Sequence, residues 1–110
     1  MSWIGVDLDG TLAFYDGWKG IEHVGDPIPA MEARVREWIR KEKTVKIFTA
    51  RCHAPEAIPF ISAWLIYNGF VYPDGKPLEV TNVKDFAMVE LWDDRAVQVE
   101  MNTGKRVDGL

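Results

Sequence analysis

The stretch that decides the fold lies near the start of the chain, where residues 3–11 read Trp-Ile-Gly-Val-Asp-Leu-Asp-Gly-Thr. The largely apolar run at residues 3–8 predicts a short buried β-strand that ends in acidic residues. Asp7 and Asp9 stand two positions apart, so their side chains can leave an extended backbone on the same face. Carboxylates held that close repel each other unless a cation lies between them. Gly10 would let the backbone turn sharply just afterwards.

Downstream of this strand, the apolar pattern alternates between helix and strand. Pro27 and Pro29 open a helix whose apolar residues recur at steps of three and four. Residues 43–49 are rich in β-branched and aromatic side chains, which is typical of a strand. A second helix is predicted over residues 55–68, with Gly69 placed to end it.

Further extended segments complete the pattern. Residues 70–72 are expected to form the third strand, and residues 73–77 carry a clear turn signal. Residues 78–83 are expected to be a short extended piece, and residues 88–92 a last strand that again ends in acids. Residues 96–107 predict a C-terminal hairpin.

The strand–helix–strand alternation predicts a single α/β domain over residues 1–110, with a Rossmann-like parallel sheet flanked by helices on both faces. Residues 10–27, rich in glycine and aromatic side chains, predict a loop or small flap. In such sheets, ligands bind beyond the carboxyl ends of the strands. Polar residues that could converge there follow three predicted strands: Asp7 and Asp9, Thr49 and Arg51, and Asp93 and Asp94.

The composition narrows the class of protein. The chain has 110 residues, of which 47% are apolar and 27% charged, and it lacks an apolar run of the about 20 residues that a membrane span needs. No signal-peptide pattern opens the chain, and the lone Cys52 excludes an intrachain disulfide. We therefore expect a cytoplasmic protein without a membrane partner. The net charge of −4 argues against strong non-specific nucleic-acid binding.

The Asp-x-Asp-Gly-Thr segment after an apolar strand resembles the first motif of the haloacid dehalogenase-like (HAD) hydrolase superfamily. Later segments resemble its other motifs in order: Thr49 at a strand end, Lys84 before a later strand, and the pair Asp93 and Asp94. The resemblance spans most of the chain and implies a minimal HAD core without a cap, bearing a short flap and a C-terminal hairpin. Acid-x-acid-Gly alone also occurs in Ca²⁺ loops and ordinary turns.

The resemblance implies a role for each motif. Asp7 would be the nucleophile, and Asp9 the general acid and base, with its main-chain carbonyl on Mg²⁺. Thr49 would donate a hydrogen bond to a phosphoryl oxygen, and Lys84 would balance charge and hold Asp7 in place. The expected site residues are, for Mg²⁺, Asp7, Asp9, Asp93 and Asp94 and, for phosphate, Gly10, Thr11, Thr49, Ala50, Arg51 and Lys84.

The implied function is Mg²⁺-dependent hydrolysis of a phosphomonoester through an aspartyl-phosphate intermediate. The substrate could be a nucleotide, another small phosphate ester or a phosphorylated nucleic-acid end, and a second subunit could close the open site in a homo-oligomer. The alternative is a non-catalytic binding or regulatory module, because fold does not fix function.

Several assignments stay open at this point. Asp93 is the first choice for the direct metal ligand and Asp94 the second. Arg51 and Arg95 could bind phosphate or could pair with those two aspartates. Lys84 could instead be an exposed charge. The flap residues that could contact a substrate, or simply hold the flap on the core, are Phe14, Tyr15, Trp18 and Lys19.

Overall fold

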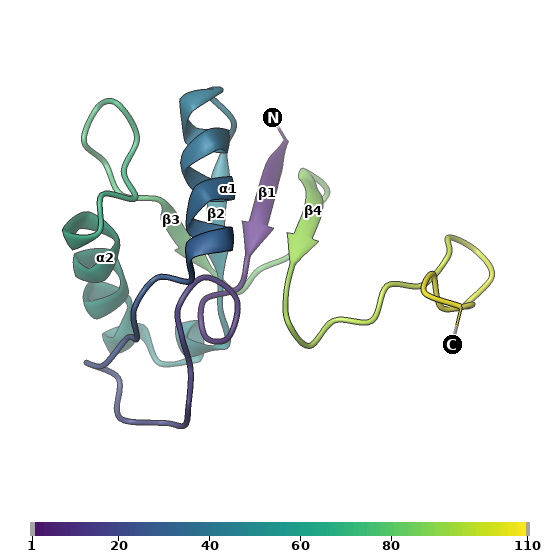
Figure 1. Cartoon of the computed structure of the whole chain (residues 1–110), viewed down its shortest axis with the longest axis horizontal. Helices are drawn as coiled ribbons and strands as arrows, with labels where there is room; N and C mark the ends of the chain where they lie inside the picture. The colour runs from purple at the N-terminus through teal and green to yellow at the C-terminus, as the bar shows by residue number, and fades with distance from the viewer. Residues whose placement is uncertain (1, 110) are drawn as a thin grey trace.

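The computed structural model describes residues 2–109, which form an α/β domain with a four-stranded parallel sheet and two α-helices (Figure 1). The spatial strand order is β3-β2-β1-β4. The Rossmann-like sheet predicted from the sequence is confirmed at this level. The strands are β1 (Trp3–Val6), β2 (Val45–Phe48), β3 (Glu79–Thr81) and β4 (Met88–Trp92), and the helices are α1 (Pro29–Arg40) and α2 (Ile58–Tyr67), with short 3₁₀ turns η1 (Ala50–His53) and η2 (Pro55–Ala57).

Strand β1 lies in the interior of the sheet, and all of its residues are buried. Ile4 is paired with Val45 of β2 on one side and with Glu90 of β4 on the other. A strand paired on both edges and apolar throughout is what parallel sheets require. Asp7, the next residue after β1, is therefore delivered to the middle of the carboxyl edge of the sheet.

Both helices have a proline in their first turn, a position that tolerates this residue. Pro29 stands in the first turn of α1, and Pro59 in the first turn of α2, where the missing N–H has no helical partner to lose. Residues 55–57, predicted to belong to the second helix, form η2 instead. Gly69 ends α2 with φ +76°, a left-handed conformation that glycine adopts without strain. Neither described helix is long and apolar enough to span a membrane.

Both helices cover the same face of the sheet, so the prediction of helices on both faces is wrong. Val35 of α1 and Leu65 of α2 belong to one buried cluster together with Val45 and Ile47 of β2. The strand order explains this arrangement. The chain steps from β1 to β2 to β3 in one direction, and successive right-handed crossovers in one direction place their helices on one side.

The opposite face of the sheet is crossed by the loop of residues 82–87, which joins β3 to β4. On this face the Nε1 of Trp3 donates to Oδ1 of Asp85 at 2.8 Å, and Nζ of Lys46 lies 4.7 Å from the Trp3 ring centroid. Phe86 in the same loop is fully exposed. Within residues 2–109, this face of the sheet is therefore covered by a loop, whereas the other face is covered by α1 and α2.

The third strand is Glu79–Thr81, so the prediction of a strand at residues 70–72 is wrong. Phe70 is fully buried, with its ring centroid 5.6 Å from that of Trp64. Val71 makes only an isolated bridge to Pro77 across the predicted turn. Packing of the Phe70 ring under α2 thus fixes this segment, and the following extended piece takes the place beside β2.

Beyond β4, the chain extends away from the body of the molecule and ends in a compact turn (Figure 1). The predicted hairpin reduces to a single bridge between Val99 and Arg106, with a hydrogen bond from the backbone N of Val107 to the carbonyl of Gln98. Residues 96–109 are called the C-terminal arm below.

Candidate functional site

The carboxyl ends of the four strands meet at one edge of the sheet, where a cavity of about 790 Å³ opens. Asp7 follows β1, Thr49 follows β2, and Asn82 follows β3. Asp93 and Asp94 follow β4. The topology thus brings the predicted polar strand ends together. The cavity is lined by Asp7, Asp9, Tyr15, Trp18, Ile21, Phe48, Thr49, Ala50, Arg51, His53, Ala54, Asn82, Asp93, Asp94 and Arg95.

A tight turn follows β1 and shapes the floor of the site. The carbonyl of Leu8 accepts hydrogen bonds from the backbone N–H groups of Thr11, Leu12 and Ala13, at 3.3, 3.0 and 2.8 Å. Gly10 stands in this turn with φ +88°, which a residue with a Cβ adopts only with strain. The Leu8 side chain is fully buried and anchors the turn. The turn carries the Thr11 hydroxyl back towards Asp7.

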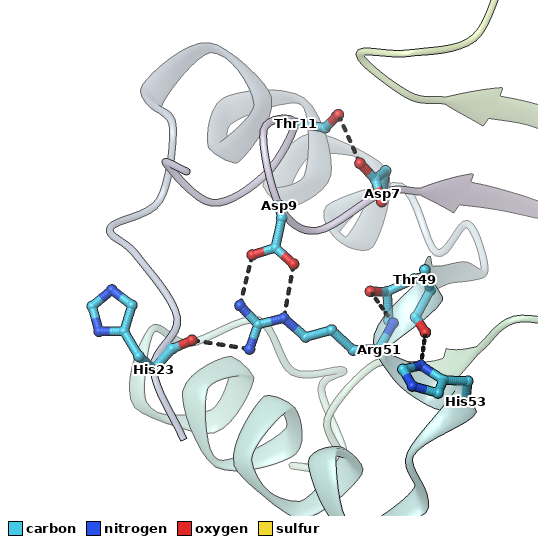
Figure 2. A network of polar contacts seen from close by, with 8 residues as sticks. Asp7, Asp9, Thr11, His23, Thr49, Arg51 and His53 are labelled. Atoms are coloured by element: carbon cyan, nitrogen blue, oxygen red, sulfur yellow. Dashed lines mark hydrogen bonds and ion pairs between the residues drawn. The ribbon is translucent and has the colours of Figure 1, made fainter. Parts of the chain in front are cut away.

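The Thr11 hydroxyl links two carboxylates of the site. It lies 3.4 Å from Oδ2 of Asp7, as Figure 2 shows. It also lies 3.0 Å from Oδ1 of Asp94 and accepts a hydrogen bond of 3.0 Å from the backbone N of Asp94. A hydroxyl has one proton, so it donates to one carboxylate at a time. Thr11 is nearly buried and holds the acidic side chains in place; its contact with phosphate stays a prediction.

Gly10 passes so close to Asp94 that no side chain fits between them. A Cβ built on Gly10 would lie 2.7 Å from Oδ2 of Asp94. The structure thus places Gly10 against the Asp94 carboxylate, and its predicted contact with phosphate stays a prediction. The first motif and the fourth are therefore in direct contact.

Three carboxyl groups gather at this point: oxygen atoms of Asp7, Asp93 and Asp94 all lie within 4.8 Å of one another. Burial raises the pKa of Asp7 to about 7, and the hydrogen bond to Asp94 and the charges of Asp93 and Asp94 act in the same direction. Partial burial of Asp94 would raise its pKa, but hydrogen bonds from Asp7 and Thr11 outweigh that effect and lower it. Without a cation, Asp7 therefore holds a proton below about pH 7.

The donor set of this cluster suits a hard divalent cation. Carboxylate oxygens are the ligands that Mg²⁺ takes from proteins, and a cation would relieve the repulsion that now raises the pKa of Asp7. Asp9, also predicted as a ligand, is not in the cluster through its carboxylate. The residues that could hold a metal by their side chains are Asp7, Asp93 and Asp94.

The Asp9 carboxylate pairs with Arg51 instead. Nε and Nη2 of Arg51 donate to the two carboxylate oxygens, both at 2.7 Å, and Nη1 donates to the carbonyl of His23 at 2.9 Å (Figure 2). The Arg51 side chain is only 6% exposed. Its guanidinium carbon also lies 4.9 Å from the ring centroid of Trp18. The sequence left two alternatives open for Arg51, binding of phosphate or an ion pair with Asp93 or Asp94. The structure pairs Arg51 with Asp9 and joins it to the flap through the carbonyl of His23.

Thr49 is buried at the end of β2 with its hydroxyl oriented for donation. Its Oγ1 accepts a hydrogen bond of 3.2 Å from the backbone N of Arg51. Because the hydroxyl acts as an acceptor in that bond, its own proton remains for a ligand in the cavity. Ala50, predicted to contact phosphate, also lines the cavity.

The structure does not bring Lys84 to the cavity. This residue is exposed on the loop after β3 and, within residues 2–109, is not part of the lining. Asn82, two positions earlier, does line the cavity and was missed, because the third strand was placed too early in the sequence. The β-branched pair Val80-Thr81 before Asn82 was the signal that could have located it.

Comparisons of this chain with protein families, with curated proteins and with solved structures found no match. The function is therefore inferred from the residues of the site and their geometry.

Proposed function

We propose that this protein is a metal-dependent phosphomonoester hydrolase of the HAD type, with Asp7 as nucleophile and Asp9 as general acid and base. The observation that carries the proposal is the cluster of Asp7, Asp93 and Asp94, within 4.8 Å of one another, in a cavity that also holds Asp9 and Thr49. The finer description of the fold belongs to this proposal: a minimal core without a cap, with residues 10–27 as flap.

The reaction would proceed in two displacements. A carboxylate oxygen of Asp7 attacks phosphorus, an O–P bond forms, and the bond from phosphorus to the leaving oxygen breaks. Asp9 gives its proton to that leaving oxygen and then takes a proton from water. The water oxygen attacks phosphorus, releasing inorganic phosphate and restoring Asp7. The Thr49 hydroxyl donates to a phosphoryl oxygen throughout.

A divalent cation such as Mg²⁺, held by Asp7, Asp93 and Asp94, would supply positive charge beside the phosphoryl oxygens. Asp7 must be ionised to attack phosphorus. Its pKa is raised to about 7 when the three carboxyl groups have no cation beside them. Lys84, the other source of positive charge implied by the resemblance, is exposed outside the cavity. Its role stays a prediction.

The ion pair between Arg51 and Asp9 sets a condition on this mechanism. A carboxylate bound through both oxygens cannot deliver a proton, so Arg51 has to release Asp9 when substrate binds. A phosphate dianion competes for the same guanidinium donors, because arginine binds phosphate and carboxylate with the same fork of N–H groups. If the pair never opens, the same site would bind a phosphorylated ligand without turnover, which is the binding-module alternative.

The test is release of inorganic phosphate from a panel of nucleotides, sugar phosphates and 5′- or 3′-phosphorylated oligonucleotides, with Mg²⁺ or with EDTA. Hydrolysis should require the metal, and Asp7→Asn should lower it by at least about 10³-fold, because the nucleophile is lost.

Asp74→Asn is the matched control, since this exposed aspartate lies in the turn at residues 73–77 and its carboxylate accepts only from the backbone N of Lys76 in the contacts described. Its activity should equal that of the wild type. Full Mg²⁺-dependent activity in Asp7→Asn would refute the assignment of the nucleophile. Mg²⁺ and phosphate binding without turnover of any ester would favour the binding module.

A further inference from the structure

Two exposed aromatic rings stand in the wall of the cavity. Trp18 is 57% exposed and Tyr15 is 40% exposed, and both line the cavity that contains Asp7 and Thr49. Large rings left open to water lose the free energy that burial would give them. In the wall of a cavity, exposed rings offer a surface on which a flat apolar group can lie.

The Trp18 ring is held in position from behind. The guanidinium of Arg51 lies 4.9 Å from its centroid, and Arg51 is itself fixed by Asp9 and by the carbonyl of His23. A cation over an aromatic face attracts the ring. Before a ligand binds, one face of Trp18 is therefore covered by a buried side chain, and more than half of the indole is left exposed.

The lining of the cavity combines two kinds of side chain. The carboxyl cluster and Thr49 are polar, and the phosphoryl group would react there. Ile21, Phe48 and Ala54 add apolar surface to that of the two rings. A cavity of about 790 Å³ exceeds what a phosphate group alone fills and falls in the range of small-molecule ligand sites.

We infer that the exposed rings of Trp18 and Tyr15 form a subsite for a planar aromatic ring in the leaving group of the phosphomonoester. This inference rests on the proposed function and narrows its substrate class. Nucleoside monophosphates and aryl phosphates share this chemistry, a flat ring attached to or one sugar away from the phosphate. Stacking of a base on an aromatic side chain strengthens binding by about 1–3 kcal/mol, which corresponds to about 5- to 150-fold in affinity.

The test measures binding, so that it does not depend on turnover. Adenosine 5′-monophosphate, phenyl phosphate and ribose 5-phosphate are titrated calorimetrically into Asp7→Asn protein with Mg²⁺. Adenosine 5′-monophosphate or phenyl phosphate should bind at least about 10-fold more tightly than ribose 5-phosphate. Tighter binding of adenosine 5′-monophosphate would indicate a nucleotide substrate, and tighter binding of phenyl phosphate an aryl phosphate. Equal affinity for all three esters overturns the subsite.

Variants of the rings separate stacking from a loss of structure. Tyr15→Ala and Trp18→Ala should each reduce the preference for the ring ligand severalfold while leaving ribose 5-phosphate affinity unchanged, and Trp18→Phe should retain most of it. Because Trp18 also contacts Arg51, Tyr15→Ala is the decisive variant. Tyr67→Ala, which removes an exposed ring at the end of α2 outside the cavity, is the control and should change nothing.

The two proposals fail in different ways. Asp7-dependent hydrolysis by the wild type combined with equal binding of all three esters would remove the ring subsite and keep the phosphatase. A ring preference that the Tyr15 variant abolishes, without hydrolysis of any ester, would keep the subsite and remove the phosphatase.

Discussion

At the scale of single residues, the site depends on contacts between segments far apart in sequence. Thr11 and Asp94 are 83 positions apart, yet one hydroxyl both accepts from the backbone of Asp94 and donates to its carboxylate. Gly10 completes this contact, because only hydrogen leaves room for the Asp94 carboxylate. The position of the Asp94 carboxylate is therefore limited by a residue that itself has no side chain.

Replacement of Gly10 by alanine should displace Asp94 and weaken Mg²⁺ binding by about 10-fold or more. The new Cβ would lie 2.7 Å from Oδ2 of Asp94, so the carboxylate has to move. The measurement is Mg²⁺ affinity by calorimetry. Gly75→Ala is the matched control: its φ of +87° gives the same backbone strain, of about 1–2 kcal/mol, with open space around the Cβ. Equal Mg²⁺ affinity in both variants would contradict the contact with Asp94.

The raised pKa of Asp7 should make the metal-free protein less stable as the pH rises. Burial and the neighbouring carboxyl groups move the pKa of Asp7 from 3.8 to about 7 on folding. Between these values the native state holds a proton that the unfolded chain has lost, so the free energy of unfolding falls with increasing pH. Asp94, whose pKa is lowered, changes protonation below this window and does not oppose the effect.

Urea unfolding in EDTA should show that the free energy of unfolding falls by about 2 kcal/mol between pH 4.5 and pH 8. This value is smaller than the full pKa shift would give, because Asp7 is partly exposed and solvent screens its interactions. Asp7→Asn should abolish most of this slope, and saturating Mg²⁺ should also reduce it, because a cation favours the ionised carboxylate. A slope that persists unchanged in Asp7→Asn would assign it to other groups.

At the scale of the elements, much of the architecture was predictable. Apolar residues dominate the runs at residues 3–8 and 88–92 and recur at helical spacing from Pro29 onward, and the structure places a strand or helix at each. The third strand was not predictable in this way. Residues 70–72 and 78–83 are both short and extended, and only the packing of Phe70 under α2 decides between them.

In the site too, some features follow from the sequence pattern and others depend on packing. Convergence of Asp7, Thr49 and Asp93 at one edge follows from the rule for parallel sheets. The partner of Arg51 does not follow from any rule of spacing, because several carboxylates lie within the reach of a long side chain. The placement of helices on one face was available from the strand order, but the sequence alone did not give that order.

The base of the flap is an element-scale joint that tolerates no added volume. The backbone N of Phe14 donates to the carbonyl of Asp26, and Nε1 of Trp64 in α2 donates to the carbonyl of Gly25 at 2.9 Å. A Cβ on Gly25 would overlap the carbonyl oxygen of Phe14. Because that oxygen belongs to the backbone, no rotation of a side chain can relieve the overlap.

Gly25→Ala should therefore destabilise the protein by about 1–3 kcal/mol, the usual cost of overpacking, and should loosen the flap. Thermal unfolding by circular dichroism measures the first effect, and faster amide hydrogen exchange over residues 14–26 the second. Gly75→Ala serves as the control for hydrogen exchange, since it lies outside the flap and has nothing within 4 Å. Unchanged exchange in Gly25→Ala would show that the flap base adapts.

At the scale of the whole molecule, the C-terminal arm stands apart from the packed core. Its apolar side chains Val97, Val99, Met101 and Val107 are all more than half exposed, and none belongs to the buried cluster. The body of the molecule is formed by the sheet and its two helices (Figure 1).

Removal of residues 97–110 should consequently leave the core folded. We expect the melting temperature to change by less than about 4 °C, which for a domain of this size corresponds to less than about 1 kcal/mol. Mg²⁺ affinity should also be retained, because Asp93 and Asp94 precede the deletion. Collapse of the native circular dichroism spectrum in the truncated protein would show that the arm is part of the core.

The contact between the turn after β1 and the end of β4 also bears on the order in which the protein folds. Strand β4 pairs with β1 alone and lies at the edge of the sheet, so its docking closes the longest loop in the structure. A partly folded chain in which β1, β2 and the two helices have assembled would carry Asp7 without its two partner carboxylates. Such a species would not respond to magnesium. The ion would bind only to molecules in which β4 has docked on β1, and by mass action it would shift the folding equilibrium towards them.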